Sequence, residues 1–391
     1  MLVFLVSWVN PTRPVFAQFI LVNIGHTNDG GSAIGLAISG NYAFLAKGGD
    51  GLSVYDISNP ANPINIGHTN NGGSALSLAV SGNYAYLANN EDGLRVYDVS
   101  YPANPINIGH IYNGGRAKSV AISGNYAFVA NEFDGLRVYD VSTPSNPINV
   151  GHTNNNNYPN EAAQAVAIAG SFAYVASIAG GLRVYDVSNP AVPSYVGNTN
   201  DGGIGGFAIG VAASANYAYV AYLYGDDSGG LRIYDVTNPT QPLHVGYTNT
   251  GAAYGVALSG SYAFISDYFH GLCVEDISVP TNPFVIACAN NPDVGAPGVA
   301  VSGNYVYLAH SADGLRIYLF APQLNVALNS SNVAFLSWPV PLAPGFVLQQ
   351  NSDLNTTNWL TLTNIPVVVS NRNQVTVSPT GGQIFYRLKA Q

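Results

Sequence analysis

The sequence predicts an all-β protein in two parts, a closed ring of repeated four-stranded units followed by a smaller β-domain. Three observations lead to this prediction. Glycine occurs 43 times and proline 23 times among the 391 residues, which indicates many tight turns. Tyrosine and phenylalanine, which favour strands, occur 26 and 15 times. A ten-residue motif that starts at Gly51 also recurs along most of the chain, so a repeat architecture is expected.

The chain begins with an apolar segment. The run from Met1 to Val9 has about half the length that a membrane-spanning helix needs, so no membrane span is predicted. Together with the following residues 14–18 (PVFAQ), it is typical of a signal peptide over residues 1–17 that is cleaved after Ala17. The alternative, an apolar N-terminal strand of the mature protein, stays open. A secreted or cell-surface location is favoured.

Each repeat contains four expected strands. In the first copy they are residues 33–38, 43–46, 52–56 and 63–68, and tight turns separate them. The third strand alternates in polarity, as a half-buried strand does. Four strands in about 42 residues are typical of a propeller blade. The glycine that opens the motif occurs seven times, as Gly51, Gly93, Gly135, Gly181, Gly230, Gly271 and Gly314.

The two ends of the repeat array complement each other. The seventh copy ends with residues 315–320 and has no fourth strand after it. Residues 21–26 match the fourth-strand pattern and have no first three strands before them. We therefore expect a seven-bladed β-propeller over residues 18–321, closed by the N-terminal strand, which leaves no free sheet edge in the ring.

The motif itself points to a family. The segment from Gly93 to Pro102 (GLRVYDVSYP) resembles the repeat of the LVIVD-repeat family of bacterial propellers, and the likeness covers about residues 19–320. The resemblance implies the propeller fold. It implies little about activity, because propellers carry many unrelated functions.

A second domain is expected over residues 322–391, where the repeat stops and Asn, Thr, Ser and Val become frequent. Residues 325–338, 345–350, 359–363, 367–377 and 384–388 are expected to contain short strands. These strands predict a small β-sandwich, which is similar to the fibronectin type III-like modules at the ends of secreted bacterial proteins.

The two cysteines occupy repeat positions that face each other. Cys273 takes the third-strand position that holds arginine in most blades, and Cys288 takes the fourth-strand position held by His68, His110 and His152. These positions are 15 residues apart in every complete blade, which places them opposite each other in one hairpin register. We predict a Cys273–Cys288 disulfide, typical of an oxidising compartment. Two buried thiols are the alternative.

Periodic histidines and aspartates are assigned to the scaffold. Four histidines lie on the outer strands of different blades, so no ion can contact two of them, and no metal site is predicted; they are His26, His68, His110 and His152. Cross-strand pairing with arginine is expected for them. The aspartates that end the third strands should accept backbone N–H groups in the following turn; they are Asp56, Asp98, Asp140, Asp186, Asp235 and Asp276. Those before glycine (Asp50, Asp92, Asp134 and Asp313) indicate hairpins.

The loops that differ between blades lie on one face of a propeller, and there we expect a ligand. Exposed Tyr and Asn with scattered acids suit sugar rings and hydroxyls, or a protein interface. Neutral variation of loops is the alternative. The candidate ligand-binding residues are Arg116, Lys118, Tyr158, Glu161, Tyr222, Tyr224, Asp226, Asp227, Tyr254 and Tyr268. The inner strands instead carry small residues at Gly35, Ser77, Ser119, Ala165, Gly210, Gly255 and Gly298, so no cofactor is predicted.

These observations predict a secreted, non-enzymatic binding or scaffold module for an extracellular polysaccharide or protein. With 12 Lys and Arg against 21 Asp and Glu, and no basic stripe, nucleic acid is not an expected partner. No nucleophile elbow, Walker loop, HExxH or CxxCH motif occurs in the sequence. The alternative is a polysaccharide lyase or hydrolase at the channel mouth, in which Tyr or His is the acid or base and Lys118 or Arg116 holds a uronate. Its candidate catalytic residues are Tyr254, Asp267, His270 and His310.

Overall fold

The structure is a computed structural model of the chain. It describes residues 19–27, 29–70, 72–112, 114–153, 162–178, 180–199, 206–223, 229–289, 298–311, 314–322, 324–328, 333–339, 346–352, 356, 358–369, 372–377 and 384–390. The expected signal peptide lies outside these residues. The chain divides into two compact units, Asn23–Tyr318 and Leu319–Gln391, and residues 19–22 belong with the second. Every assigned element in the described part is a β-strand.

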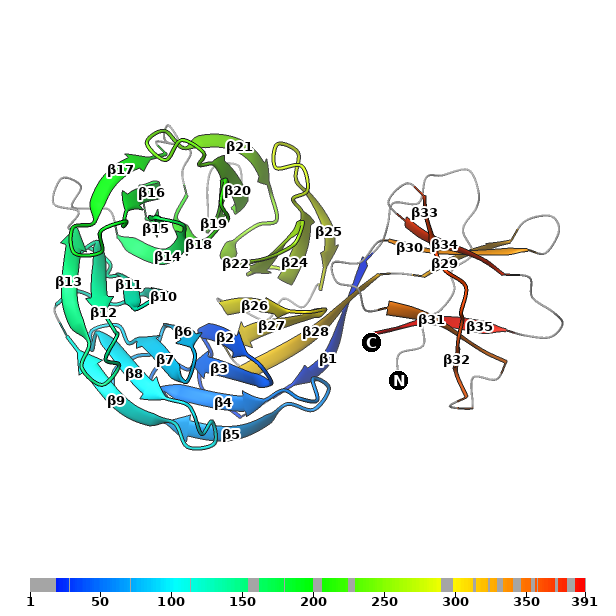
Figure 1. Ribbon diagram of the computed structural model, residues 1–391, viewed down its shortest axis with the longest axis horizontal. Helices are drawn as coiled ribbons and strands as arrows, with labels where there is room; N and C mark the ends of the chain where they lie inside the picture. Colours follow the sequence, from blue (N-terminus) through cyan, green and yellow to red (C-terminus); the bar gives the residue numbers. More distant parts are fainter. Residues whose placement is uncertain are drawn as a thin grey trace. The chain divides into compact units, whose positions relative to one another are not determined.

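Seven four-stranded antiparallel sheets form the larger unit and are arranged as the blades of a ring (Figure 1). Blade 1 contains β2 (Gly35–Ser39), β3 (Tyr42–Ala46), β4 (Leu52–Asp56) and β5 (Ile64–Thr69); blade 2 contains β6 (Ser77–Ser81), β7 (Tyr84–Ala88), β8 (Leu94–Asp98) and β9 (Ile106–Ile111); blade 3 contains β10 (Ser119–Ser123), β11 (Tyr126–Ala130), β12 (Leu136–Asp140) and β13 (Ile148–Thr153); blade 4 contains β14 (Ala163–Ala169), β15 (Phe172–Ser177), β16 (Gly181–Asp186) and β17 (Ser194–Asn198).

The remaining blades follow the same order. Blade 5 contains β18 (Ala208–Ala213), β19 (Tyr217–Tyr222), β20 (Gly230–Asp235) and β21 (Leu243–Thr248); blade 6 contains β22 (Ala253–Ser259), β23 (Tyr262–Asp267), β24 (Gly271–Asp276) and β25 (Phe284–Cys288); blade 7 contains β26 (Gly298–Ser302), β27 (Tyr305–His310), β28 (Gly314–Pro322) and β1 (Phe19–His26). The first strand of each blade lies nearest the centre of the ring and the fourth lies at its rim (Figure 1).

The N-terminal strand closes the ring, as the sequence predicts. The sheet of blade 7 has the order β1-β28-β27-β26, so the first strand of the chain completes the last blade. The backbone N–H of Thr27 donates to the carbonyl oxygen of Leu315 at 2.8 Å. The N–H of Leu315 donates in return to the Thr27 hydroxyl at 3.0 Å.

The repeated third strand packs against both neighbouring blades. In blade 2, Leu94 and Val96 lie in a core cluster shared with blade 3, whereas Tyr97 and Val99 lie in one shared with blade 1. Because successive side chains of a strand point to opposite faces, one five-residue motif supplies apolar contacts to two blades. The aspartate after it ends the strand: the Ser100 hydroxyl and, at 2.9 Å, the Ser100 backbone N–H donate to the Asp98 carboxylate, and both lower the pKa of that carboxyl.

The small residues of the inner strands allow adjacent blades to approach closely. A Cβ atom on Gly210 would lie 2.4 Å from the carbonyl oxygen of Tyr254 in the next blade. On Gly35 it would lie 2.8 Å from that of Leu76, and on Gly298 2.8 Å from that of Ile34. These separations are shorter than any normal carbon–oxygen contact, so packing of the blades explains this column.

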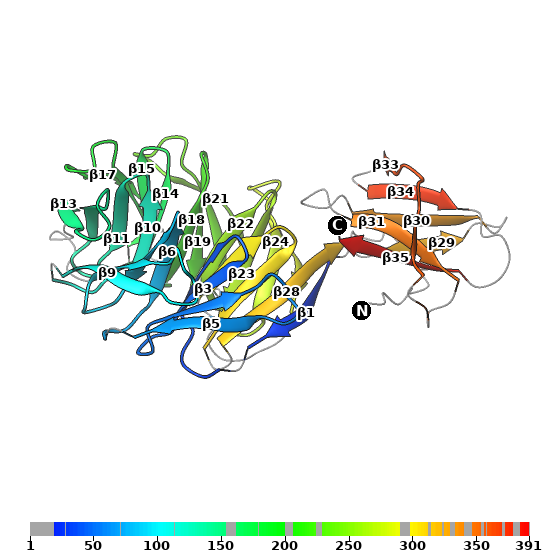
Figure 2. The ribbon, with the colours of Figure 1, turned by 60° about the horizontal axis from the view of Figure 1, so that its bottom comes forward.

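The smaller unit is a two-sheet sandwich (Figure 2). One sheet has the order β29 (Asn325–Leu328), β30 (Ala334–Pro339), β34 (Arg372–Val377), β33 (Val367–Val369), and the other has the order β32 (Leu360–Thr361), β31 (Phe346–Asn351), β35 (Phe385–Ala390). Leu336 and Trp338 of the first sheet share one buried cluster with Leu348 and Leu388 of the second. Its likeness to fibronectin type III modules stays a prediction. A search of the described residues found no helix long and apolar enough to cross a membrane.

The close approach at the centre can be tested with Gly210→Ala. The added methyl group would meet backbone rather than a movable side chain, so we expect a loss of about 1–3 kcal/mol in the free energy of unfolding. Denaturant unfolding measures this loss. Ser77→Ala, at the same position of blade 2, is the control and should change stability far less. Equal effects of the two substitutions would contradict the packing argument.

Candidate functional site

Blades 2 and 3 fasten their outer strands with the same polar cluster, which we call the clamp. In blade 2, the Asp92 carboxylate accepts hydrogen bonds from Arg95 Nε and, at 2.7 Å, from Asn89 Nδ2. His110 Nε2 lies 2.7 Å from the Asp92 carbonyl oxygen and 3.3 Å from its carboxylate. In blade 3 the equivalent residues are Asn131, Asp134, Arg137 and His152, and they make the same contacts.

The clamp corrects the expected role of the histidines. The strand register does place Arg95 opposite His110 and Arg137 opposite His152. However, neither imidazole bonds to the arginine, because both side chains present N–H donors and need an acceptor between them. The aspartate of the hairpin turn supplies that acceptor.

Blade 6 replaces all four clamp residues. Asp267 stands at the position of Asn89, His270 at that of Asp92, Cys273 at that of Arg95 and Cys288 at that of His110. Cys273 and Cys288 are paired in the register and form a disulfide, which confirms the sequence prediction. The disulfide therefore joins β24 to β25 covalently where blades 2 and 3 use the clamp.

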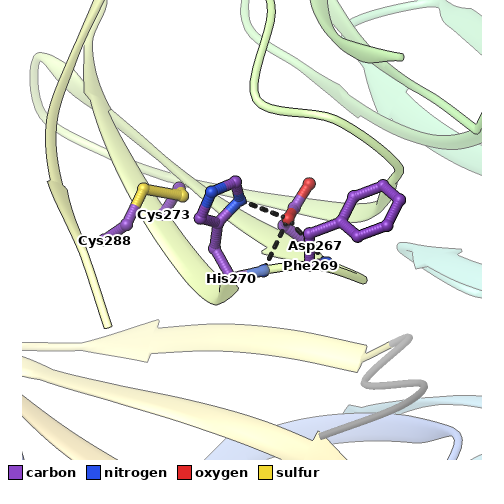
Figure 3. Close-up of a disulfide and its surroundings, with 5 residues drawn as sticks. All are labelled: Asp267, Phe269, His270, Cys273 and Cys288. Carbon is purple, nitrogen blue, oxygen red and sulfur yellow. Dashed lines mark hydrogen bonds and ion pairs between the residues drawn. A yellow bond between two sulfur atoms is a disulfide. The ribbon is translucent and has the colours of Figure 1, made fainter. Parts of the chain in front are cut away.

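His270, the turn residue at the position of Asp92, makes no clamp in blade 6 because the disulfide already joins the two strands. Asp267 orients the His270 side chain instead. Asp267 is 1% exposed. Its Oδ1 accepts the backbone N–H groups of Phe269 at 2.9 Å and His270 at 2.8 Å. The same oxygen lies 2.8 Å from His270 Nδ1 (Figure 3). An ionised carboxylate only accepts, so Nδ1 carries a proton, and in the neutral ring Nε2 is the acceptor.

Aromatic side chains adjoin this oriented histidine. The rings of Tyr254 and Tyr268 are 6.3 Å apart, and those of Tyr268 and Phe269 are 5.3 Å apart, edge to face. Phe269 is 53% exposed, and the His270 side chain is 39% exposed. We call Tyr254, Asp267, Tyr268, Phe269 and His270 the blade-six site. Sequence reasoning missed Phe269, although the aromatic run 268–270 marks it.

Arg116 and Lys118, two of the expected ligand-binding residues, form ion pairs with glutamates. Arg116 Nη2 lies 2.9 Å from Glu91 Oε1, and Arg116 Nη1 lies 3.5 Å from Glu132 Oε2. Lys118 Nζ lies 3.3 Å from the other oxygen of Glu132. Two cations and two carboxylates thus form a neutral network on blades 2 and 3, apart from the blade-six site.

Other candidates are buried at one repeat position. The residue at or just after the end of the second strand is buried and polar in all seven blades; the set is Lys47, Asn89, Asn131, Ser177, Tyr222, Asp267 and His310. Tyr222 is 3% exposed, and its hydroxyl contacts that of Tyr234 at 2.9 Å. His310 is 1% exposed in the neighbouring blade. The structure therefore brings Tyr254, Tyr268, Asp267 and His270 to one place, without Tyr222 or His310.

The rest of the expected set cannot be placed. Tyr158, Glu161, Tyr224, Asp226 and Asp227 lie outside the described residues. Within the part of the chain that the structure covers, no group of three or more His, Cys, Asp or Glu side chains could hold a metal ion.

The fold defines the class: seven four-stranded sheets, closed by the first strand of the chain, make a seven-bladed β-propeller. Seven segments match the family described as the LVIVD repeat, namely residues 30–71, 72–112, 114–155, 161–201, 205–250, 250–288 and 295–317. These segments span well over half of the chain. The chain belongs to the LVIVD repeat family.

Solved structures resemble the chain in fold alone. The computationally designed Ika8 protein aligns with a TM-score of 0.54 at 11% identity, covering 78% of this chain and 100% of that chain. The β-propeller domain of Cps50 (Swd1) from Myceliophteria thermophila aligns with a TM-score of 0.59 at 13% identity, covering 76% and 99%. No curated protein matches the sequence.

The disulfide should contribute strongly to stability because it closes a loop in the unfolded chain. For the 15-residue separation of Cys273 and Cys288, we expect Cys273→Ala with Cys288→Ala to lower the free energy of unfolding by about 3 kcal/mol. Denaturant unfolding measures the change. Reductant should destabilise the wild type and leave the double variant unaffected. Equal stability of the two proteins would show that β25 is held by other contacts.

Proposed function

We propose that the protein is a secreted, non-enzymatic binding module whose blade-six site takes an extracellular polysaccharide with uncharged sugar rings. The observation that carries this proposal is the exposed Phe269 ring, packed edge to face on a half-buried Tyr268, beside a histidine of fixed orientation. Aromatic faces suit the apolar faces of sugar rings, and an oriented imidazole suits a hydroxyl group. The replacement of the whole clamp in this one blade supports a role beyond folding.

The charge arrangement favours a neutral ligand. Arg116 and Lys118, the cations expected to hold a uronate, are already neutralised by Glu91 and Glu132. An acidic sugar would have to break these ion pairs before it gained a charge contact. The net charge of −9 would also repel an anionic polymer.

Secretion is part of the proposal. The disulfide fits an oxidising compartment, and residues 1–17 have the pattern of a signal peptide. In this proposal the domains are residues 18–321, which bind the ligand, and residues 322–391, a fibronectin type III-like module. A protein is the other partner that the exposed aromatic residues would suit.

A second candidate function is polysaccharide cleavage, and the Asp267–His270 pair favours it. A buried carboxylate that fixes the tautomer of a half-exposed histidine leaves Nε2 able to take a proton from a substrate. Tyr254 could then supply a proton to the leaving group. His310 is buried and is no longer a candidate for contact with the polymer in this arrangement.

The binding function can be tested with Phe269→Ala and a matched control. We expect this change to weaken binding of a neutral polysaccharide about tenfold, because the variant loses ring stacking worth roughly 1.4 kcal/mol. Phe133→Ala removes the equivalent phenylalanine of blade 3, which is 59% exposed, and should leave binding unchanged. Calorimetric titration against a panel of neutral and acidic polysaccharides measures both affinities.

The same panel separates binding from cleavage. Reducing and unsaturated ends are measured in parallel with affinity, and neither should appear if the module only binds. Products that disappear in His270→Asn would instead establish the second function. Failure of every polysaccharide to bind would contradict the carbohydrate proposal in favour of a protein partner.

The orienting role of Asp267 predicts a distinct outcome. Asp267→Asn keeps the size of the side chain but can no longer offer two charged acceptor oxygens to the 269–270 turn. We expect affinity for the polysaccharide to fall about as far as in His270→Ala. The double variant should be no weaker than either single variant, because both remove the same oriented imidazole. Additive losses in a double-mutant cycle would contradict this dependence.

A further inference from the structure

Blade 6 also differs from the other blades at a buried position away from its aromatic residues. Glu275 is fully buried, at 0% exposed. It occupies a third-strand position at which each of the other blades carries a tyrosine, as Tyr55, Tyr97, Tyr139, Tyr185, Tyr234 and Tyr318. The side chain at this position faces the preceding blade, as Tyr97 faces blade 1. Glu275 therefore places a carboxyl group in the seam between blades 5 and 6.

The equivalent seam between blades 7 and 1 shows how the fold accommodates a charge there. The Tyr55 hydroxyl donates to Asp29 Oδ2 at 2.6 Å. Lys47 Nζ lies 3.3 Å from Asp29 Oδ1 and is 4% exposed. The buried Lys47 ammonium group is thus paired with a carboxylate at the exposed end of the seam, as a buried charge requires.

In the seam between blades 5 and 6, the lysine position holds a second acid. Asp267 aligns with Lys47, Thr250 with Asp29 and Thr248 with Thr27. The seam therefore contains two carboxyl groups and no lysine or arginine at the equivalent positions. His270 is the basic group on Asp267, and it contacts Oδ1 only.

Five buried oxygen atoms of this seam make no hydrogen bond of normal geometry with the described residues. They are Thr248 Oγ1, Thr250 Oγ1, Asp267 Oδ2, Glu275 Oε1 and Glu275 Oε2. Their residues are 9%, 6%, 1% and 0% exposed, in chain order. Two hydroxyl groups can donate at most two hydrogen bonds to the three carboxyl oxygens of this set, so the ionised seam has more acceptors than donors, which indicates a ligand that supplies positive charge.

The connection from β21 to β22 links the two acids. The Thr248 hydroxyl is close enough to the Glu275 carboxyl to lower its pKa as a hydrogen-bond donor, whereas the charge of Asp267 raises the pKa of the same carboxyl. A Cβ atom on Gly251 would lie 3.4 Å from Asp267 Oδ2, so residues 248–251 run past both carboxyl groups. Burial raises the pKa of Glu275 to about 7, which reflects the cost of its charge without a counter-ion.

We propose that the seam between blades 5 and 6 binds a calcium ion, with the carboxylates of Glu275 and Asp267 and the hydroxyl oxygens of Thr248 and Thr250 as its protein-side acceptors. All of these atoms are oxygens, the ligands that hard cations prefer. Calcium is favoured over magnesium because it accepts more ligands in irregular arrangements, whereas magnesium demands near-octahedral geometry. The ion would take the place that the Lys47 ammonium group holds in the equivalent seam.

The melting temperature of the full chain measured with calcium chloride, with magnesium chloride and after chelation tests this proposal. Calcium should raise the melting temperature of the wild type in a saturable manner, and chelation should reverse the rise. Glu275→Tyr restores the residue of the other blades and should fold without responding to calcium. Glu275→Gln, which keeps the shape of the side chain, should weaken calcium binding at least tenfold in a calorimetric titration.

Controls keep this test separate from polysaccharide binding. Asp29→Asn alters the equivalent seam between blades 7 and 1 and should leave the calcium response intact. An equal calcium response in the wild type and in Glu275→Tyr would overturn the proposal. The absence of any calcium response in the wild type would also overturn it. If that wild type also becomes more stable as the pH falls from 8 to 5, Glu275 simply retains its proton instead of binding an ion. Neither result depends on whether a polysaccharide binds.

Discussion

Side chains that alternate along the third strand of each blade hold the ring together, because a four-stranded sheet cannot cover its own two faces. Leu94 and Val96 are buried against one neighbouring blade while Tyr97 and Val99 are buried against the other. Each blade therefore depends on two others, and the dependence runs around the whole ring. Glycine at positions such as Gly210 brings the inner strands close enough for these contacts to form.

The outer strand of a blade has only one neighbouring strand and needs further fastening. Blades 2 and 3 use an aspartate that holds an arginine and a histidine together, and blade 6 uses a covalent bond. Whether a blade has the clamp or the disulfide decides what the residue in the adjoining hairpin turn contacts. A clamp occupies the turn residue with scaffold contacts, whereas the disulfide leaves His270 to be oriented by Asp267 instead. A disulfide in place of the clamp thus gives residues 268–270 different side-chain contacts, while the four strands of the blade stay the same.

The repeat made most of the fold predictable. Its period, its incomplete copy at each end and the constant separation of the two positions that hold Cys273 and Cys288 are properties of spacing, and spacing determines register. The burial of a side chain and its hydrogen-bond partners are harder to predict from spacing. The sequence placed Tyr222 and His310 among exposed loop residues, but both end a second strand beneath a turn and are buried. The partner of His110 was also missed, because register shows which residue is opposite and not which atoms can accept a hydrogen bond.

Closure by the N-terminal strand makes the order of synthesis matter for folding. Thr27 and Leu315 bond across 288 residues, so the ribosome must add most of the propeller before β1 has its partner. At a synthesis rate of about 5–20 residues per second, the wait is roughly 15–60 s. During that time the backbone groups of β1 and the open face of blade 1 stay exposed to other chains. A chaperone, or an export route that keeps the chain unfolded until it is complete, would protect the protein through this interval.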